Sequence, residues 1–205
     1  MALSKIDTAN MIDNLNLSTG PVAGTIQNAN LPDNTYKLLA ETDFTSGTTH
    51  VVFDNSTFTG SGYDNIYFQC TRWTPSTDGD ELIMYLSDDN GSSLEDAHNG
   101  RLYIRASSSA ASGAEQQDAG YARFETNPGN DANRGINVTC WMPDFNKSAS
   151  SRKAGNYITT GMEQTYNYTW HGGFVTQNTV AALNYLKFST AASGTHSGII
   201  RIYGY

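Results

Sequence analysis

Residues 63–91 read YDNIYFQCTRWTPSTDGDELIMYLSDDNG, and this stretch holds the pattern that decides the fold. Apolar residues recur at every second position over residues 66–70 and again over residues 82–86. Alternation with a period of two is typical of a β-strand that buries one of its faces. Turn-forming residues follow each run, at 74–79 and at 88–91. The stretch therefore predicts two strands and two turns.

The same alternation continues through the rest of the chain, in short runs separated by residues that favour turns. It is found at residues 102–104, 136–142, 186–188 and 200–202. No helical pattern of ten or more residues lies between these runs, which excludes an alternating strand–helix architecture. The pattern predicts an all-β domain, built as a sandwich or a barrel, whose last strand belongs to the core.

Two segments follow the alternation poorly. Residues 106–120 contain almost no large apolar side chain, so we expect a long loop there. Residues 179–185 have some helical character, but they lead directly into the next apolar run, and we expect a strand. Both expectations concern the connections between strands and leave the fold class unchanged.

Composition and charge exclude several classes of function. The chain has 205 residues, with 12 Lys and Arg against 20 Asp and Glu, and a formal net charge of −8. Nucleic acids and anionic lipid surfaces both require a basic protein surface, so we expect neither as a partner. No run approaches the roughly 20 apolar residues of a membrane span. The first ten residues also lack the pattern of a secretory signal.

The aromatic residues divide the chain at position 36. The 3 Trp, 12 Tyr and 8 Phe all lie at or after Tyr36, and aromatic side chains bury the most area. We therefore expect an N-terminal arm over residues 1–35 and one β-domain over residues 36–205. The arm is expected to be extended or partly helical, with these apolar side chains available for assembly: Leu3, Ile6, Met11, Ile12, Leu15 and Leu17. It is either a disordered tail or an arm that orders on a partner or a neighbouring subunit.

No catalytic motif stands out in the sequence. His50, His98, His171 and His196 are far apart and lack the spacing of metal ligands, so we expect them in loops. The segment from Gly194 to Gly198 places a histidine beside a serine, but neighbours along a strand point to opposite faces. We interpret that segment as a turn.

Two acidic patterns could in principle form chemical sites. Residues 88–91 resemble half of a calcium loop, yet a hairpin turn explains the same residues, because Asn and Gly tolerate a positive φ. Four glutamates have no spacing that favours a glycosidase pair: Glu81, Glu95, Glu125 and Glu163. We therefore predict no catalytic residue, no metal and no cofactor.

The cysteines and tryptophans carry the remaining expectations. Cys70 and Cys140 fall on the apolar faces of their strands, which favours two buried free thiols. Trp73 and Trp141 are expected on the opposite faces of the same strands, and Trp170 lies in a third aromatic stretch. The three tryptophans either form a second layer of the core or contact a glycan or a neighbouring subunit.

Residues 63–91 are similar to a pattern found in virion structural proteins of tailed marine bacteriophages, such as cyanophages and pelagiphages. The pattern consists of a Tyr-led strand, a loop with Pro and Asp-Gly, an alternating strand ending in Ser, and an Asn-Gly turn. The ending SGIIRIYGY, residues 197–205, resembles the terminal strand of the same proteins, and residues 3–12 resemble their N-termini.

The resemblance implies an antiparallel jelly-roll-like β-sandwich in a head decoration protein or a tail or fibre appendage. It also implies a homo-oligomer, expected to be a trimer, whose partners are other proteins of the shell or tail of a virion assembled in the host cytoplasm. It supplies no catalytic residues. The chain departs from the pattern in its two cysteines and in residues 106–120.

Three hypotheses about function follow. The first is a non-enzymatic virion component, exposed on the particle surface and anchored by residues 1–35. The second is an adhesin module at a fibre tip that binds a host surface glycan through aromatic side chains. The third is a sandwich enzyme that degrades a polysaccharide. The missing catalytic motifs favour the first two.

Overall fold

The computed structural model describes residues 36–105, 111–124, 128–130, 135–162 and 167–205. The expected arm, residues 1–35 with its six apolar side chains, lies outside the described residues. The same holds for Glu125 and Glu163. The architecture described below is therefore that of the β-domain.

Strands account for nearly all secondary structure in the described residues. Their bounds are β1 (Lys37–Thr48), β2 (His50–Phe53), β3 (Ile66–Pro75), β4 (Leu82–Ser87), β5 (Ala97–Arg105), β6 (Ala111–Ala119), β7 (Ala122–Arg123), β8 (Ile136–Met142), β9 (Ala154–Met162), β10 (Asn167–Thr176), β11 (Tyr185–Thr190) and β12 (His196–Gly204). A single helical turn, α2 (Asn55–Phe58), follows β2. Its N-cap is Asp54, whose carboxylate accepts a hydrogen bond from the Ser56 backbone N–H at 2.9 Å.

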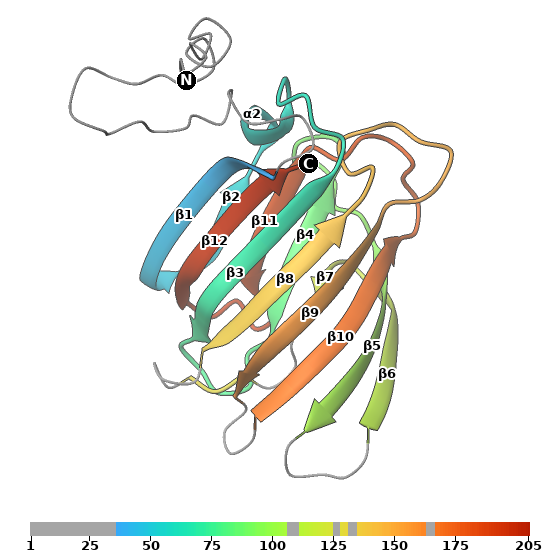
Figure 1. Ribbon diagram of the computed structural model, residues 1–205. Helices are drawn as coiled ribbons and strands as arrows, with labels where there is room; N and C mark the ends of the chain where they lie inside the picture. Colours follow the sequence, from blue (N-terminus) through green and yellow to red (C-terminus); the bar gives the residue numbers. More distant parts are fainter. Residues whose placement is uncertain (1–35, 106–110, 125–127, 131–134, 163–166) are drawn as a thin grey trace, which may run out of the picture.

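The strands form two antiparallel sheets (Figure 1). The larger has the order β1-β12-β3-β8-β9-β10-β5-β6, and the smaller has the order β2-β11-β4-β7. The terminal strand β12 lies between β1 and β3 in the larger sheet. The expected all-β class is confirmed, the two sheets are arranged as in a β-sandwich, and the terminal strand belongs to the core.

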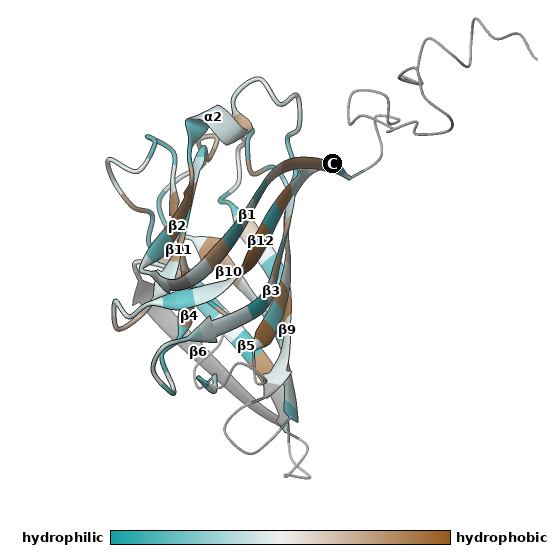
Figure 2. Cartoon of the chain, turned by 90° about the vertical axis from the view of Figure 1, so that its left-hand side faces the viewer, coloured by the Kyte–Doolittle hydropathy of each residue, from teal (hydrophilic) through white to brown (hydrophobic). Residues whose placement is uncertain are grey.

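The core lies between the two sheets, where the apolar faces of the alternating strands meet. Phe68 on β3 packs against Phe188 on β11, with ring centroids 4.9 Å apart. Phe124, which follows β7, packs edge-on against both Phe68 and Tyr157 on β9. Figure 2 shows the smaller sheet, with β2 and β11, standing apart from β1 and β12 of the larger one. Each fully buried side chain contributes roughly 1.5–3 kcal/mol to this packing.

Strands β3 and β12 are both bulged at the same level, and the bulge corrects one expectation. Arg72 has a φ of 55° and Gly198 a φ of 153°, and the pairing register shifts beside each of them. The extra residue reverses the alternation beyond Cys70. Trp73 is therefore on the same inner face as Cys70 and is fully buried, not on the opposite face as expected.

Residues 111–119 form strand β6, so the expectation of a loop over residues 106–120 is wrong for this part. The strand lies at the edge of the larger sheet and pairs with β5 alone. An edge strand is held by backbone hydrogen bonds on one side, and it needs no row of apolar side chains to form. Residues 106–110 lie outside the described residues.

Residues 179–184 are neither the expected strand nor a helix, since β11 begins only at Tyr185. They carry the chain from β10 in the larger sheet to β11 in the smaller one. Isolated hydrogen bonds, and not the regular pairing of a β-ladder, fix the position of this connecting segment. The Thr179 hydroxyl donates to Asp88 at 2.7 Å, and the Leu183 N–H donates to the Phe145 carbonyl at 2.7 Å. Tertiary contacts thus outweigh the local apolar pattern here.

The four histidines lie on strands and not in loops. His50 is on β2, His98 on β5, His171 on β10, and His196 is the first residue of β12. The expected turn over residues 194–198 is therefore wrong from His196 onward. The alternation predicts the ends of these strands only approximately, because polar residues on the outer face of a strand resemble those of a loop.

The turn after β4 is confirmed, but it does not close a hairpin. Asn90 and Gly91 both have positive φ, 62° and 86°, as the sequence predicts. However, β4 and β5 belong to different sheets, so the turn connects the two layers. The Asp89 carboxylate accepts hydrogen bonds from Ser93 and Ser87, and these hold its pKa at about 2.

Candidate functional site

The outer face of the larger sheet carries a cluster of aromatic side chains. Strand pairing places Tyr203 on β12 opposite Tyr67 on β3, and Tyr67 opposite Trp141 on β8. The centroid of the Tyr67 ring lies 5.7 Å from that of Tyr203 and 5.2 Å from that of Trp141. Because these residues alternate with buried ones, all three rings face away from the core.

Two further tyrosines extend this row at the end of the domain. Tyr36, the first described residue, lies 5.2 Å from Tyr67 and 4.9 Å from Tyr205 between ring centroids. Its side chain is 49% exposed. We call Tyr36, Tyr67, Trp141, Tyr203 and Tyr205 the outer aromatic patch. It joins the start of β1 to the end of β12, where the C-terminus lies (Figure 1).

Polar groups border the outer aromatic patch. Gln69 donates a hydrogen bond from its side-chain amide to the Tyr67 hydroxyl at 2.8 Å. Burial raises the pKa of Tyr67, so the hydroxyl stays protonated and can itself donate. Asn156 on β9 stands opposite Trp141 in the strand register and is exposed. Arg201 pairs with Glu41 one step further along the same face.

A polar hollow of about 430 Å³ adjoins the patch at Tyr205. Its other walls include Tyr63, Asp64 and Asn65, from the segment that leads into β3, and Lys37 from β1. The Lys37 ammonium lies 5.5 Å from the centre of the Tyr63 ring. The hollow and the patch thus form one continuous surface of aromatic rings and hydrogen-bonding groups.

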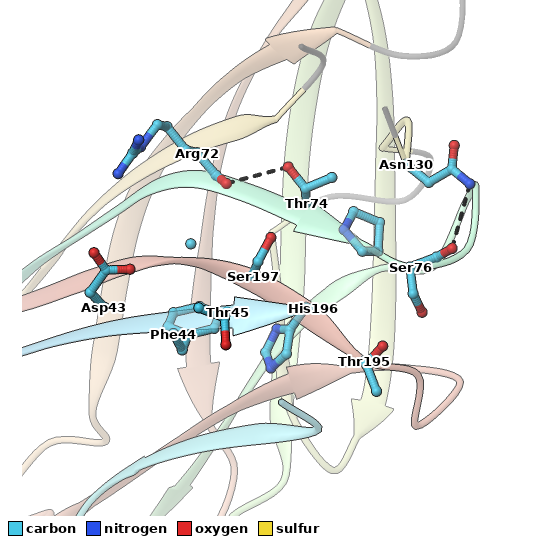
Figure 3. A pocket seen from close by; sticks show the side chains of 12 residues that line it. Asp43, Phe44, Thr45, Arg72, Thr74, Ser76, Asn130, Thr195, His196 and Ser197 are labelled. Carbon is cyan, nitrogen blue, oxygen red and sulfur yellow. Dashed lines mark hydrogen bonds between the residues drawn. The ribbon is translucent and has the colours of Figure 1, made fainter. Parts of the chain in front are cut away.

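A second hollow, of about 580 Å³, lies at the bulged ends of β1, β3 and β12 (Figure 3). Asp43 and Arg72 stand at one end of it, and Ser76 and Asn130 at the other. The Asn130 side chain donates to the Ser76 carbonyl at 3.5 Å. Several hydroxyls line the space between, so the hollow offers hydrogen bonds to a small polar molecule.

His196 forms the buried wall of the second hollow and is 1% exposed. The Trp73 indole N–H donates to its Nδ1 at 2.6 Å, so the proton of the neutral ring sits on Nε2. Burial lowers the pKa of His196 to about 4, against a smaller opposing effect from Asp80. The Nε2 atom is buried and has no hydrogen-bond partner. The ring is therefore neutral and cannot serve as a base through Nδ1.

The neighbouring serine does not complete a catalytic pair with His196. Figure 3 shows the Ser197 hydroxyl and the His196 ring on opposite sides of β12. Nucleophilic catalysis requires the hydroxyl within hydrogen-bond reach of an unoccupied ring nitrogen. Within the described residues, no three His, Cys, Asp or Glu side chains gather as metal ligands.

The sequence-predicted tryptophans separate into two groups. Trp141 is part of the outer aromatic patch, on the face where it was expected. Trp73 is buried beside His196 and is not available to a glycan or another subunit. Trp170 is on the inner face of β10, only 5% exposed, with the Arg101 guanidinium 4.6 Å above its ring. Strand alternation alone could not distinguish the three.

The cysteines lie where the sequence placed them. Cys70 and Cys140 are both free and buried, on neighbouring strands β3 and β8. Burial raises the pKa of both thiols well above the ordinary value, so they remain protonated and unreactive. They act as small apolar side chains in the core.

The tyrosines of the outer aromatic patch are not among the site residues that the sequence predicts. Tyr67, Tyr203 and Tyr205 each alternate with a buried or packed neighbour. That signal was present in the sequence, since a large aromatic residue on the polar side of an alternating strand marks an exposed ring. Their proximity depends on the order of the strands, which the sequence does not show.

Comparison with known proteins gives no match: no family model, no curated protein and no solved structure is similar to this chain. In the described part of the chain, no helix is long and apolar enough to cross a membrane. The function is therefore inferred from the residues and their geometry.

Proposed function

We propose that this chain is a non-enzymatic structural subunit of a bacteriophage virion. It is a surface component, either a capsid decoration or a tail or fibre appendage, and residues 1–35 anchor it. The observation that carries the proposal is the place of the resembling segments in the fold. Residues 63–91 supply β3 and β4, and residues 197–205 supply most of β12, which pairs with β3. The resembling segments therefore supply two paired strands of the larger sheet and one strand of the smaller.

The proposal includes a jelly-roll-like arrangement of the two antiparallel sheets. Its support is the way in which successive strands divide between the sheets. Strands β1 and β2, β3 and β4, and β11 and β12 each place one member in the larger sheet and one in the smaller. Jelly-roll sandwiches recur in viral coat proteins, where they pack side by side in symmetric shells. A homotrimer is the assembly that we propose.

The anchoring role of residues 1–35 is supported by where they join the domain. Tyr36 packs on Tyr205, so the arm connects at the end of the domain where β12 ends. An arm joined at one end can reach a neighbouring subunit while the two sheets remain exposed. When several copies bind together, their weak contacts combine to attach the subunits stably to the particle.

Removal of residues 1–35 is expected to abolish incorporation into particles and to leave the domain folded. Tagged full-length and truncated chains are expressed in an infected culture of the source host, and the tag is measured on gradient-purified particles. A second variant keeps the length of the arm but replaces its apolar side chains with serine, and it should also fail to incorporate. The residues replaced are Leu3, Ile6, Met11, Ile12, Leu15 and Leu17. Equal incorporation of the truncated and full-length chains would contradict the anchoring role.

A second candidate function is an adhesin module at a fibre tip that binds a host surface glycan. The outer aromatic patch is the observation that favours it, because Trp141 and the four tyrosines are partly exposed beside polar groups. The two functions are compatible, since an exposed virion subunit can also bind the host surface.

A further inference from the structure

The outer aromatic patch has the chemistry of a surface that binds sugar rings. A pyranose presents C–H groups on its faces and hydroxyls around its edge. The faces pack on aromatic rings, and the hydroxyls need donors and acceptors in the same plane. Trp141, Tyr67 and Tyr203 supply three neighbouring rings, and Gln69 and Asn156 supply amides on the same sheet face.

The row of rings matches a chain of sugars better than a single residue. Strands in a sheet lie about 4.8 Å apart, so rings on three adjacent strands span roughly 10 Å. Tyr36 contacts the middle ring of this row, Tyr67, and leads through Tyr205 to the polar hollow of about 430 Å³. The surface therefore offers contacting aromatic rings from Trp141 through Tyr67 and Tyr36 to Tyr205, where the hollow begins.

The polar hollow favours hydrogen bonding to neutral groups. Its two charged side chains have opposite sign, and each already has a partner: Asp64 pairs with Lys147 at 3.3 Å, and Lys37 lies over the Tyr63 ring. Asn65 adds an amide to the wall, and its oxygen accepts a hydrogen bond from the Asp144 backbone N–H at 2.9 Å. With a net charge of −8, the chain would also repel an anionic polymer.

We propose that the outer aromatic patch and the adjoining hollow form a binding site for a neutral polysaccharide. Its pyranose rings stack along Trp141, Tyr67 and Tyr36, with Tyr203 beside Tyr67, and the end of the bound segment enters the hollow beside Tyr205. Gln69 and Asn156 place amides beside the rings, where the hydroxyls at the edge of a pyranose would lie. The site is a property of the folded domain, so it stands whether or not the chain is a virion subunit.

The test is retardation of the purified full-length chain in native gels that contain a soluble polysaccharide. Laminarin, mannan, dextran and xylan are the neutral probes, and alginate is the anionic comparison. We expect retardation by at least one neutral polysaccharide and none by alginate. Titration calorimetry with the corresponding hexasaccharide then gives the affinity. No retardation by any of the four neutral polysaccharides would overturn the proposal.

Substitutions distinguish this site from any other on the molecule. Trp141→Ala should weaken binding by about tenfold or more, the effect of losing one stacked ring. Tyr36→Ala, at an exposed position on the edge of the patch, is the second variant should the first fail to fold. The matched control is Tyr85→Ala, which removes a partly exposed tyrosine from the smaller sheet. Equal affinity in all three variants would contradict the proposal.

The same variants separate a sugar site from a contact between copies of this chain. Sedimentation measures the oligomeric state of the wild-type chain and of Trp141→Ala. If the wild type self-associates, the variant does not, and no neutral polysaccharide binds, the patch is a subunit contact and the proposal is wrong. Binding of a neutral polysaccharide that is lost in Trp141→Ala without a change of oligomeric state supports it.

Discussion

Replacement of Ile202 with aspartate is expected to unfold the domain. Ile202 is fully buried on β12, opposite Ala40 on β1 and Phe68 on β3. An unpaired carboxylate at this point would cost several kcal/mol, which is comparable with the total stability of about 5–15 kcal/mol for a domain of this kind. Near-ultraviolet circular dichroism should lose its aromatic signal, and the cooperative thermal transition should disappear.

The neighbouring residue provides the control for this substitution. Arg201 points to the outer face and pairs with Glu41, so Arg201→Gln should cost no more than about 1 kcal/mol. The variant should melt cooperatively, close to the wild-type temperature. If Ile202→Asp instead melts like the wild type, the packing of the two sheets on this face of β12 is not as described.

Stability should fall as the pH is lowered from about 6.5 to about 4, because of His196. Burial lowers the pKa of His196 to about 4 in the folded domain, against an ordinary value near 6.5 in the unfolded chain. Asp80 and His50 are the charged or titratable neighbours that also act on it. Between these two pH values the unfolded chain binds the extra proton, so the stability is present above pH 6.5 and is lost toward pH 4. The expected loss is about 3 kcal/mol.

The measurement is the free energy of urea unfolding at pH 7, 6, 5 and 4, in the wild type and in His196→Asn. The asparagine oxygen can accept the hydrogen bond from the Trp73 indole in place of Nδ1, but it does not titrate. Over this range the free energy of unfolding of the wild type should fall by about 3 kcal/mol relative to that of His196→Asn. Parallel pH profiles would show that the histidine is not held neutral.

The sequence predicted the parts of the fold that depend on local alternation. The strands around Phe68, Met84, Val138 and Ile200 lie where the apolar pattern placed them, and each of these side chains is fully buried. Alternation is a property of neighbouring residues in the chain, so it can be recognised in the sequence without knowing which strand pairs with which. The division of the strands between two sheets required the structure.

The errors arose where pairing or backbone geometry overrides the pattern. The bulge at Arg72 moves Trp73 to the inner face, and nothing in the sequence marks this arginine for a positive φ. On β5, the apolar alternation over residues 102–104 favours a buried Leu102, yet this residue is 48% exposed. Strand β6 was missed because an edge strand of small and polar residues looks like a loop.

The candidate site was predicted only in part. Trp141 was identified from its position on the polar face of its strand. The tyrosines beside it lie just before β1, on β3, and on or just after β12, and the order β1-β12-β3-β8 brings them together. Sequence position separates Tyr67 from Tyr203 by most of the domain, so no local pattern links them.

The most direct test of the proposed function is the copy number of this chain in purified virus particles from its source. Quantitative mass spectrometry gives the ratio of the chain to the major shell protein. We expect the chain in the particles, at a ratio of the same order as the shell protein for a capsid decoration and far lower for a tail or fibre appendage. Absence of the chain from clean, infectious particles would contradict a virion subunit.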